Sequence, residues 1–265
     1  MILPLFKREL RSCLLPTAII AAVTVLYAGV IIGMYDPELG ESLALMRDAM
    51  PELFAAFGMA DQGTTLLEFV VNYLHGFLLV VLPLVLAAVL ASRLVVRHIE
   101  RGSIAYLLAQ PVGRIRLMVS QAAVLLFCLV LLAAVLTVFE LACAQAMFPG
   151  ELAVADLVAV NSATFCMWVF LSGACWAGAC TLPSVSAARW VGVSVCTLFV
   201  LVQMLSGVGE ELSWLGDITP LALLDPLGAA GGQPGALAGA AVLGISGAAL
   251  FAAGTAVFAR RDLSV

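Results

Sequence analysis

The stretch Arg97–Arg114 reads RHIERGSIAYLLAQPVGR and stands between two long apolar runs of the chain. Because charged side chains are costly inside a bilayer, this stretch is expected to face water between two membrane-spanning helices. Gly102 and Ser103 favour a turn after the charged start, and Pro111 ends the short apolar helix that follows. The stretch therefore has the form of a short helix that docks on something outside the bilayer.

The composition excludes an ordinary soluble domain. The 265-residue chain is 63% hydrophobic and 11% charged, and its mean hydropathy is +1.14. Soluble domains carry about a quarter charged residues. The sequence has no basic stripe interleaved with aromatic residues, so we expect no nucleic-acid partner. Its seven cysteines form no C-x-x-C pair and fall mostly in apolar runs, which favours thiols packed between helices over disulfides or a metal site.

Six runs reach the length of about 20 apolar residues that a helix needs to cross a bilayer. They predict an all-α integral membrane protein with one transmembrane domain over residues 1–265. The expected spans are residues 14–34, 69–91, 117–142, 157–180, 190–208 and 236–259. The first run resembles a signal peptide but is long for one, so we expect it to stay uncleaved.

The distribution of charge predicts the orientation, because Lys and Arg gather on the cytoplasmic side of a membrane. With the N-terminus inside, the inner segments 1–13, 92–116, 181–189 and 260–265 hold eleven of the twelve basic residues. The outer segments 35–68, 147–156 and 209–235 hold thirteen of the seventeen acidic residues. We therefore expect six spans with both termini cytoplasmic, in the plasma membrane and specifically the cytoplasmic membrane of a bacterium.

The N-terminal segment alternates apolar and basic residues at helical spacing. Lys7, Arg8 and Arg11 form one face, and Leu3, Phe6 and their apolar neighbours form the other. Such a helix lies in the headgroup layer, parallel to the membrane. The alternative is a basic flank that only sets the topology.

Polar residues within predicted spans are candidates for a translocation pathway, because their burial in lipid is costly. These residues are Asn72, Glu140, Asn161 and Gln203, with His75 near Asn72. All lie toward the predicted outer ends of their spans, where they could form a polar vestibule. The alternative is that Glu140 reaches the outer headgroups and the amides bridge helices.

Several common catalytic patterns are absent from the sequence. It lacks a G-x-x-x-x-G-K-[ST] phosphate loop, an H-E-x-x-H pair and a G-x-S-x-G turn. His75 and His98 lie at opposite ends of the second predicted span and cannot share a metal. We therefore expect that the chain is not an enzyme and that any nucleotide is bound by another chain.

The loop between the second and third predicted spans contains Glu100-Arg101-Gly102-Ser103, followed by Leu107-Leu108, Pro111-Val112 and Arg114. In these residues it resembles the corresponding loop in permease subunits of type-2 ABC exporters. Three further stretches are similar to that family: Lys7–Leu10, Phe54–Gly58 and Phe258–Leu263. The resemblance thus covers nearly the whole chain. It departs at Gln121, where many members of the family have a lysine.

The resemblance implies a six-helix permease that pairs with a second copy or a sibling permease and binds two separate ATPase subunits. ATP and magnesium would be held by those subunits, and this chain would need no cofactor. The coupling helix would use Glu100, Arg101, Gly102, Ser103, Leu107, Leu108 and Pro111. In that helix Glu100 and Arg101 contact the rim of an ATPase groove, and Leu107 and Leu108 anchor in it.

Two alternatives accompany this interpretation. In the first alternative, the loop is an arginine cluster that only sets topology. In the second, the chain is an anchoring or assembly subunit of an ABC-type complex that performs mechanical work. If the protein is an exporter, its apolar spans favour a hydrophobic or amphipathic cargo, such as an antibiotic, a short peptide or a lipid.

Overall fold

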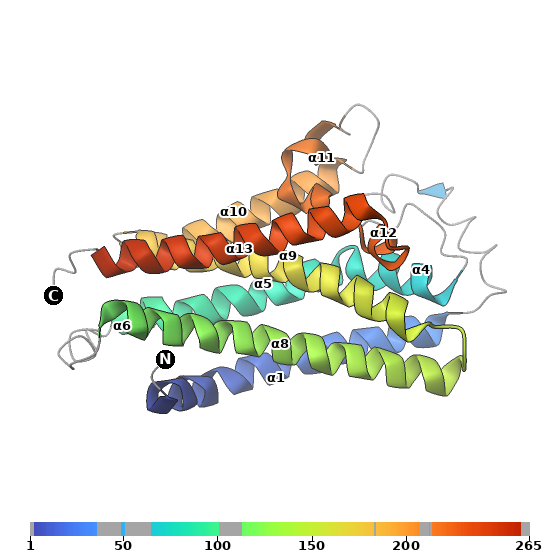
Figure 1. Ribbon diagram of the computed structural model, residues 1–265, viewed down its shortest axis with the longest axis horizontal. Coiled ribbons are helices and arrows are strands. Elements are labelled where there is room, and N and C mark those ends of the chain that lie inside the picture. Colours follow the sequence, from blue (N-terminus) through green and yellow to red (C-terminus); the bar gives the residue numbers. More distant parts are fainter. Residues whose placement is uncertain are drawn as a thin grey trace.

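The computed structural model describes residues 3–35, 49–50, 65–100, 113–182, 184–206, 212 and 214–260. Within these ranges it contains six helices that are long and apolar enough to cross a membrane. They are α1 (Leu3–Met34), the continuous helix Leu78–Glu100, α8 (Arg114–Met147), α9 (Val154–Thr181), α10 (Val185–Ser206) and α13 (Pro234–Arg260). The helices run side by side in an elongated bundle (Figure 1). This confirms the predicted all-α chain with six helices of spanning length, which is the architecture of a multi-pass membrane protein.

The second spanning helix lies further along the chain than residues 69–91. It consists of α5 (Leu78–Ala91), η3 (Ser92–Val96) and α6 (Arg97–Glu100) without interruption. The residues before it form the short α4 (Leu66–Val70) and η2 (Val71–His75), followed by a turn at Gly76 and Phe77. Glycine is a poor helix former, and the backbone of Phe77 departs from helical angles, with φ −130° and ψ −51°. The other five helices begin and end within a few residues of the predicted spans, except that α1 begins eleven residues earlier.

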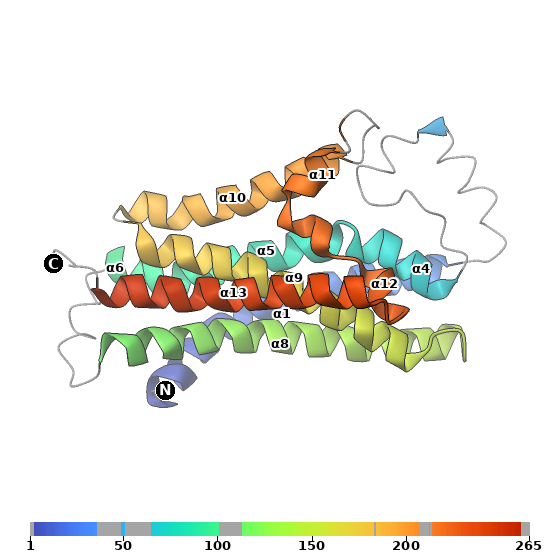
Figure 2. The ribbon, with the colours of Figure 1, turned by 45° about the horizontal axis from the view of Figure 1, so that its top comes forward.

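The two ends of the bundle differ in charge. The start of α1, the second spanning helix from η3 through α6, the starts of α8 and α10 and the end of α13 lie together at one end (Figures 1 and 2). We call it the basic end, because these segments carry every Lys and Arg of the described residues. The opposite, acidic end carries α4, α11 (Trp214–Ile218), η5 (Pro220–Leu223) and α12 (Pro226–Ala230).

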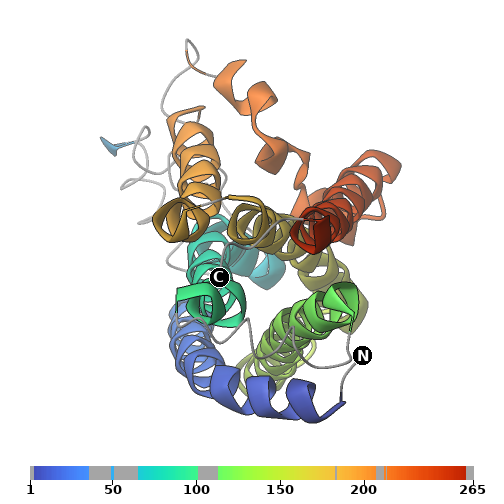
Figure 3. The ribbon, with the colours of Figure 1, turned by 90° about the vertical axis from the view of Figure 1, so that its left-hand side faces the viewer.

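The first turns of α1 lie across the bundle axis, whereas the rest of α1 runs along the bundle (Figure 3). Lys7, Arg8 and Arg11 are exposed on these turns, and Glu9 is buried. Pro16 lies within α1 and cannot donate to the carbonyl of Ser12. Arg93 of η3 supplies the missing donor, because its Nη1 lies 3.0 Å from Ser12 O. The bend of α1 is thus tied to the second spanning helix.

A second proline is compensated in the same way. Pro83 lies within α5 and leaves the carbonyl of Leu79 without its usual helical donor. The indole Nε1 of Trp168 on α9 donates to Leu79 O at 2.6 Å, and both residues are buried. The backbone of α5 is therefore satisfied by a side chain from the neighbouring helix.

Glycines bring α9 into direct backbone contact with two other helices. A Cβ at Gly173 would lie 2.6 Å from Gly247 O on α13, and a Cβ at Gly178 would lie 2.8 Å from Gly192 N on α10. Small residues at such crossings let helix backbones approach closely. α9 is thus the helix on which α5, α10 and α13 pack.

Small residues recur at four-residue spacing along α13, at Gly235 and Gly239 and at Ala240, Gly244, Ala248 and Ala252, but only part of this set is buried. In the structure nothing lies within 4 Å of a Cβ at Gly235, and Ala248 and Ala252 are exposed. The buried face includes Gly239 and Ala240 and continues through Leu243, Gly247, Phe251, Gly254 and Phe258. The sequence alone could not fix this rotation, because both stripes have helical spacing.

We predict that the cost of Trp168→Phe depends on Pro83. Alone, Trp168→Phe leaves Leu79 O buried without a donor and lowers the free energy of unfolding by about 1–3 kcal/mol. In a Pro83→Ala background the backbone N–H at position 83 donates to Leu79 O. Trp168→Phe should therefore lower the free energy of unfolding by less in that background. Unfolding of the purified chain in mixed micelles measures both values. Trp176→Phe, which removes a bond to Thr255 Oγ1, is the control, and its cost is independent of position 83.

Candidate functional site

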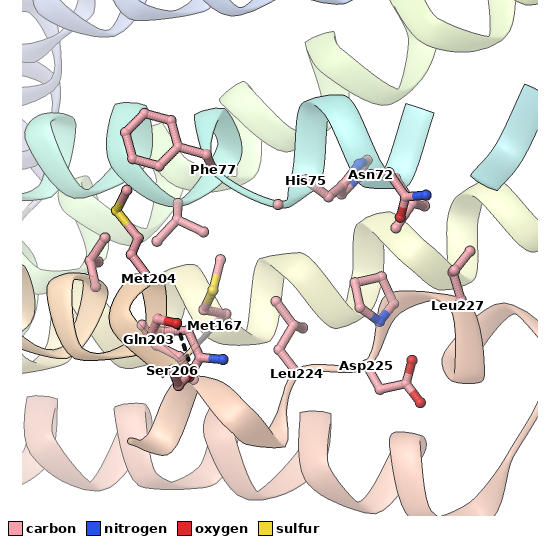
Figure 4. A pocket seen from close by; sticks show the side chains of 16 residues that line it. Asn72, His75, Phe77, Met167, Gln203, Met204, Ser206, Leu224, Asp225 and Leu227 are labelled. Atoms are coloured by element: carbon pink, nitrogen blue, oxygen red, sulfur yellow. Dashed lines mark hydrogen bonds between the residues drawn. The ribbon is translucent and has the colours of Figure 1, made fainter. Parts of the chain in front are cut away.

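A cavity of about 380 Å³ opens between α5, α9 and α10 near the acidic end of the bundle. Asn72 and His75 lie on the η2 side of the cavity, and Gln203 and Leu224 lie on the opposite side (Figure 4). Met167 of α9 lies between the two sides. The lining is mostly apolar, with the few polar groups placed on facing walls.

The cavity lies where α10 separates from α9. Near the basic end the two helices touch through Gly178 and Gly192. Toward the acidic end their facing residues are Met167 on α9 and Gln203 and Met204 on α10, which are long side chains. Figure 2 shows α10 rising away from α9 in this direction. The change from small to long side chains therefore opens the space.

Asn161 joins His75 to α8 through a buried chain of hydrogen bonds. Its Nδ2 donates to Glu140 Oε2 at 2.6 Å and to Thr137 Oγ1 at 3.0 Å. Its Oδ1 lies 2.9 Å from His75 Nε2 and must accept that bond, because Nδ2 is the donor of the amide. His75 Nε2 therefore carries a hydrogen, and Asn161 fixes the orientation of the ring.

The structure brings together the polar residues that had been predicted on separate spans. Asn72, His75 and Gln203 line the cavity. Asn161 is hydrogen-bonded to His75 and donates to Glu140. Glu140 is fully buried, so it does not reach the headgroups as the alternative had it. Asn161 does bridge helices, which is the other half of that alternative. Sequence reasoning missed Thr137 and Thr219, since a lone threonine carries no pattern, whether in an apolar helix (Thr137) or in a loop (Thr219).

Thr219 fixes the amide of Gln203. The Thr219 hydroxyl donates to Gln203 Oε1, which leaves the amide nitrogen of Gln203 as its donor group. Asp225 also lines the cavity, but its Oδ1 accepts from Gly228 N at 2.8 Å and caps α12. Figure 4 shows the Asp225 carboxylate turned away from Asn72 and His75.

At the basic end, three contacts join the second spanning helix to its neighbours. Besides Arg93 on Ser12 O, His98 Nε2 lies 3.6 Å from Glu9 Oε1 of α1. Glu100 Oε1 lies 2.5 Å from Arg189 Nη2 near the start of α10. Of the predicted coupling residues, Glu100 is thus paired within the chain. The others lie outside the described residues: Arg101, Gly102, Ser103, Leu107, Leu108 and Pro111.

One continuous helix connects the basic-end contacts to the cavity. It runs from Leu78 to Glu100 without a break, with Val80 on the cavity wall. The twenty residues from Val80 to Glu100 span about 30 Å at 1.5 Å per residue. α10 makes the same connection, since Arg189 lies near its start and Gln203 near its end. The two walls of the cavity therefore continue into the two partners of one ion pair.

No protein-family model, curated protein or solved structure matches the chain.

We predict that Asn161→Leu lowers the free energy of unfolding by about 1–3 kcal/mol, because it leaves the buried Glu140 and His75 and the half-buried Thr137 without their partner. Glu140→Gln should cost less, since the amide oxygen still accepts from Asn161 Nδ2. Denaturation in mixed micelles gives both values. Gln121→Leu is the control, a buried amide whose Oε1 has no partner among the described residues. Equal losses for Asn161→Leu and Gln121→Leu would mean that the chain of bonds adds no stability.

Proposed function

We propose that the chain is the membrane-spanning permease subunit of an ATP-binding-cassette exporter. In this proposal it pairs with a second copy or a sibling permease, and separate ATPase subunits bind beneath the pair. The basic end faces the cytoplasm, and the acidic end with its cavity faces the outside. The observation that carries the proposal is the unbroken helix Leu78–Glu100, which joins the start of the coupling loop to the cavity wall.

The segregation of charge supports this orientation. Every described Lys and Arg lies at the end that also carries both described ends of the chain. Positive residues gather on the cytoplasmic side of membrane proteins. The first turns of α1 lie across the bundle with Lys7, Arg8 and Arg11 exposed, which suits a helix in the cytoplasmic headgroup layer.

The contacts at the basic end support a coupling role for the loop that follows Glu100. A segment transmits a displacement only if its anchor points are rigid. The helix that enters the loop is held to α1 by Arg93 and to α10 by Glu100. A rigid-body movement of the loop would therefore move both walls of the cavity. Such a movement between two states is the change that alternating access requires.

The energy for that movement would come from a partner. Since the sequence has no phosphate-binding loop, ATP and magnesium would be bound by ATPase subunits. Leu107 and Leu108 would anchor the coupling helix in a groove of such a subunit, with Arg101 at its rim. Gly102 and Ser103 would make the turn into that helix, and Pro111 would end it.

The decisive experiment is purification of the chain from its native membranes with any bound ATPase. We expect an ATPase subunit in the complex and an ATPase rate that falls when Leu107 and Leu108 are both replaced by Ala. Leu237→Ala is the control, an exposed leucine at the far end of α13. Absence of an ATPase, or a rate unchanged by the double replacement, would overturn the proposal.

A charge swap tests the pair between Glu100 and Arg189. We predict that Glu100→Arg weakens ATPase stimulation by up to about fivefold, because an exposed ion pair contributes about 0.2–1 kcal/mol and the reversal replaces attraction with repulsion. The double variant Glu100→Arg/Arg189→Glu should recover most of the stimulation. A double variant as impaired as the single one would show that Glu100 acts outside this pair.

A further inference from the structure

We infer that the cavity between α5, α9 and α10 is a binding site for an uncharged, mostly apolar molecule that carries a hydrogen-bond acceptor such as a carbonyl. This site would be a property of the chain alone. It needs no ATPase, so it can be tested separately from the proposed function.

The size and lining of the cavity suit a small organic molecule. Its volume of about 380 Å³ is within the range of small-molecule sites, about 300–1,000 Å³. Phe77, Met167, Met204 and Leu224 supply apolar walls. Methionine side chains adapt their shape to different ligands. The lining therefore selects ligands by their polarity more than by their shape.

Gln203 supplies the polar contact. Its Oε1 already accepts from Thr219, so its amide nitrogen is the group that can donate to a ligand. The only donor of the other polar ring is already used, because His75 Nε2 donates to Asn161, and the second ring nitrogen, Nδ1, can only accept. A ligand acceptor near Gln203 would therefore pair with the amide donor of Gln203.

The charges around the cavity exclude an ionic ligand. Among the described residues that line it, none is Lys or Arg, so an anion would have no counter-charge. The one carboxylate, Asp225, caps α12 and is turned away from the opposite wall. Burying a charge without a partner is costly, whereas an uncharged acceptor needs only a donor. The arrangement therefore selects an uncharged molecule.

Benzophenone is a suitable probe, since it is uncharged, apolar, photoreactive and carries one carbonyl. The full chain in nanodiscs would be irradiated with benzophenone, and labelled residues would be mapped by mass spectrometry. Anionic 4-benzoylbenzoate and cationic 4-(aminomethyl)benzophenone have the same photochemistry and differ in charge. We expect saturable labelling at Met167 and Met204 by benzophenone and much weaker labelling there by both charged analogues.

Two variants separate the cavity from lipid-facing background. Gln203→Leu should lower benzophenone labelling of Met167 by about fivefold, the equivalent of one hydrogen bond of about 1 kcal/mol. Its fold is preserved, because the Thr219 hydroxyl still has Gly216 O at 3.1 Å. Met204→Trp should also weaken labelling, because the larger side chain narrows the space. Gln121→Leu makes the same chemical change at a buried site on α8 and should leave labelling unchanged.

The inference is overturned if labelling at Met167 does not saturate, if Gln203→Leu labels like Gln121→Leu, or if a charged analogue labels as well as benzophenone. Competition gives an independent check. Benzanilide, which has a carbonyl, should compete better than diphenylmethane, which lacks one. Equal competition would show a cavity that takes any apolar molecule, including lipid chains, and would remove the role of Gln203.

Discussion

The bundle depends on one constraint: a backbone carbonyl that loses its helical donor needs another donor where water is absent. Two prolines remove a helical donor, one from the exposed carbonyl of Ser12 and one from the carbonyl of the buried Leu79. Both are satisfied by side chains of other helices, Arg93 on Ser12 and Trp168 on Leu79. Because the bond to Leu79 O is buried, Pro83 requires a donor from the helix beside it, whereas the bond to Ser12 O is exposed. The bond from Arg93 joins the bent α1 to η3, and the bond from Trp168 joins α5 to α9.

α9 is the helix that contacts most of the other helices in the bundle. It donates to α5 through Trp168, and it meets α13 and α10 at backbone distance through Gly173 and Gly178. The same helix carries Asn161, which holds Glu140 of α8 and His75 of η2. Packing and polar bridging thus converge on one helix. The cavity lies where that helix ceases to present small residues to α10.

The helices were predictable from the sequence, but the geometry of the site was not. Runs of apolar residues indicate length: four of the six spans matched closely, and α1 begins eleven residues before its predicted span. The second span shifted because hydropathy cannot detect a break at Gly76 and Phe77, which are compatible with an apolar run. The polar residues Asn72, Glu140, Asn161 and Gln203 were identifiable as unusual. Their partners depend on the rotation of each helix, which sequence periodicity does not determine when hydrophobic residues surround the whole helix.

The geometry of α10 gives the contact between Gly178 and Gly192 a mechanical consequence. A Cβ at Gly192 would lie 2.8 Å from Cys175 Cα, so this crossing is the point at which α10 cannot be displaced from α9. Arg189 lies three residues before it and Gln203 lies eleven residues after it. At 1.5 Å per residue these arms are about 4.5 and 16 Å long. Rotation of α10 about this crossing would therefore move the cavity wall three to four times as far as the ion pair, about 4 Å for each ångström at Arg189. A small displacement at the basic end is sufficient to change the width of a cavity of this size, because the crossing lies close to that end.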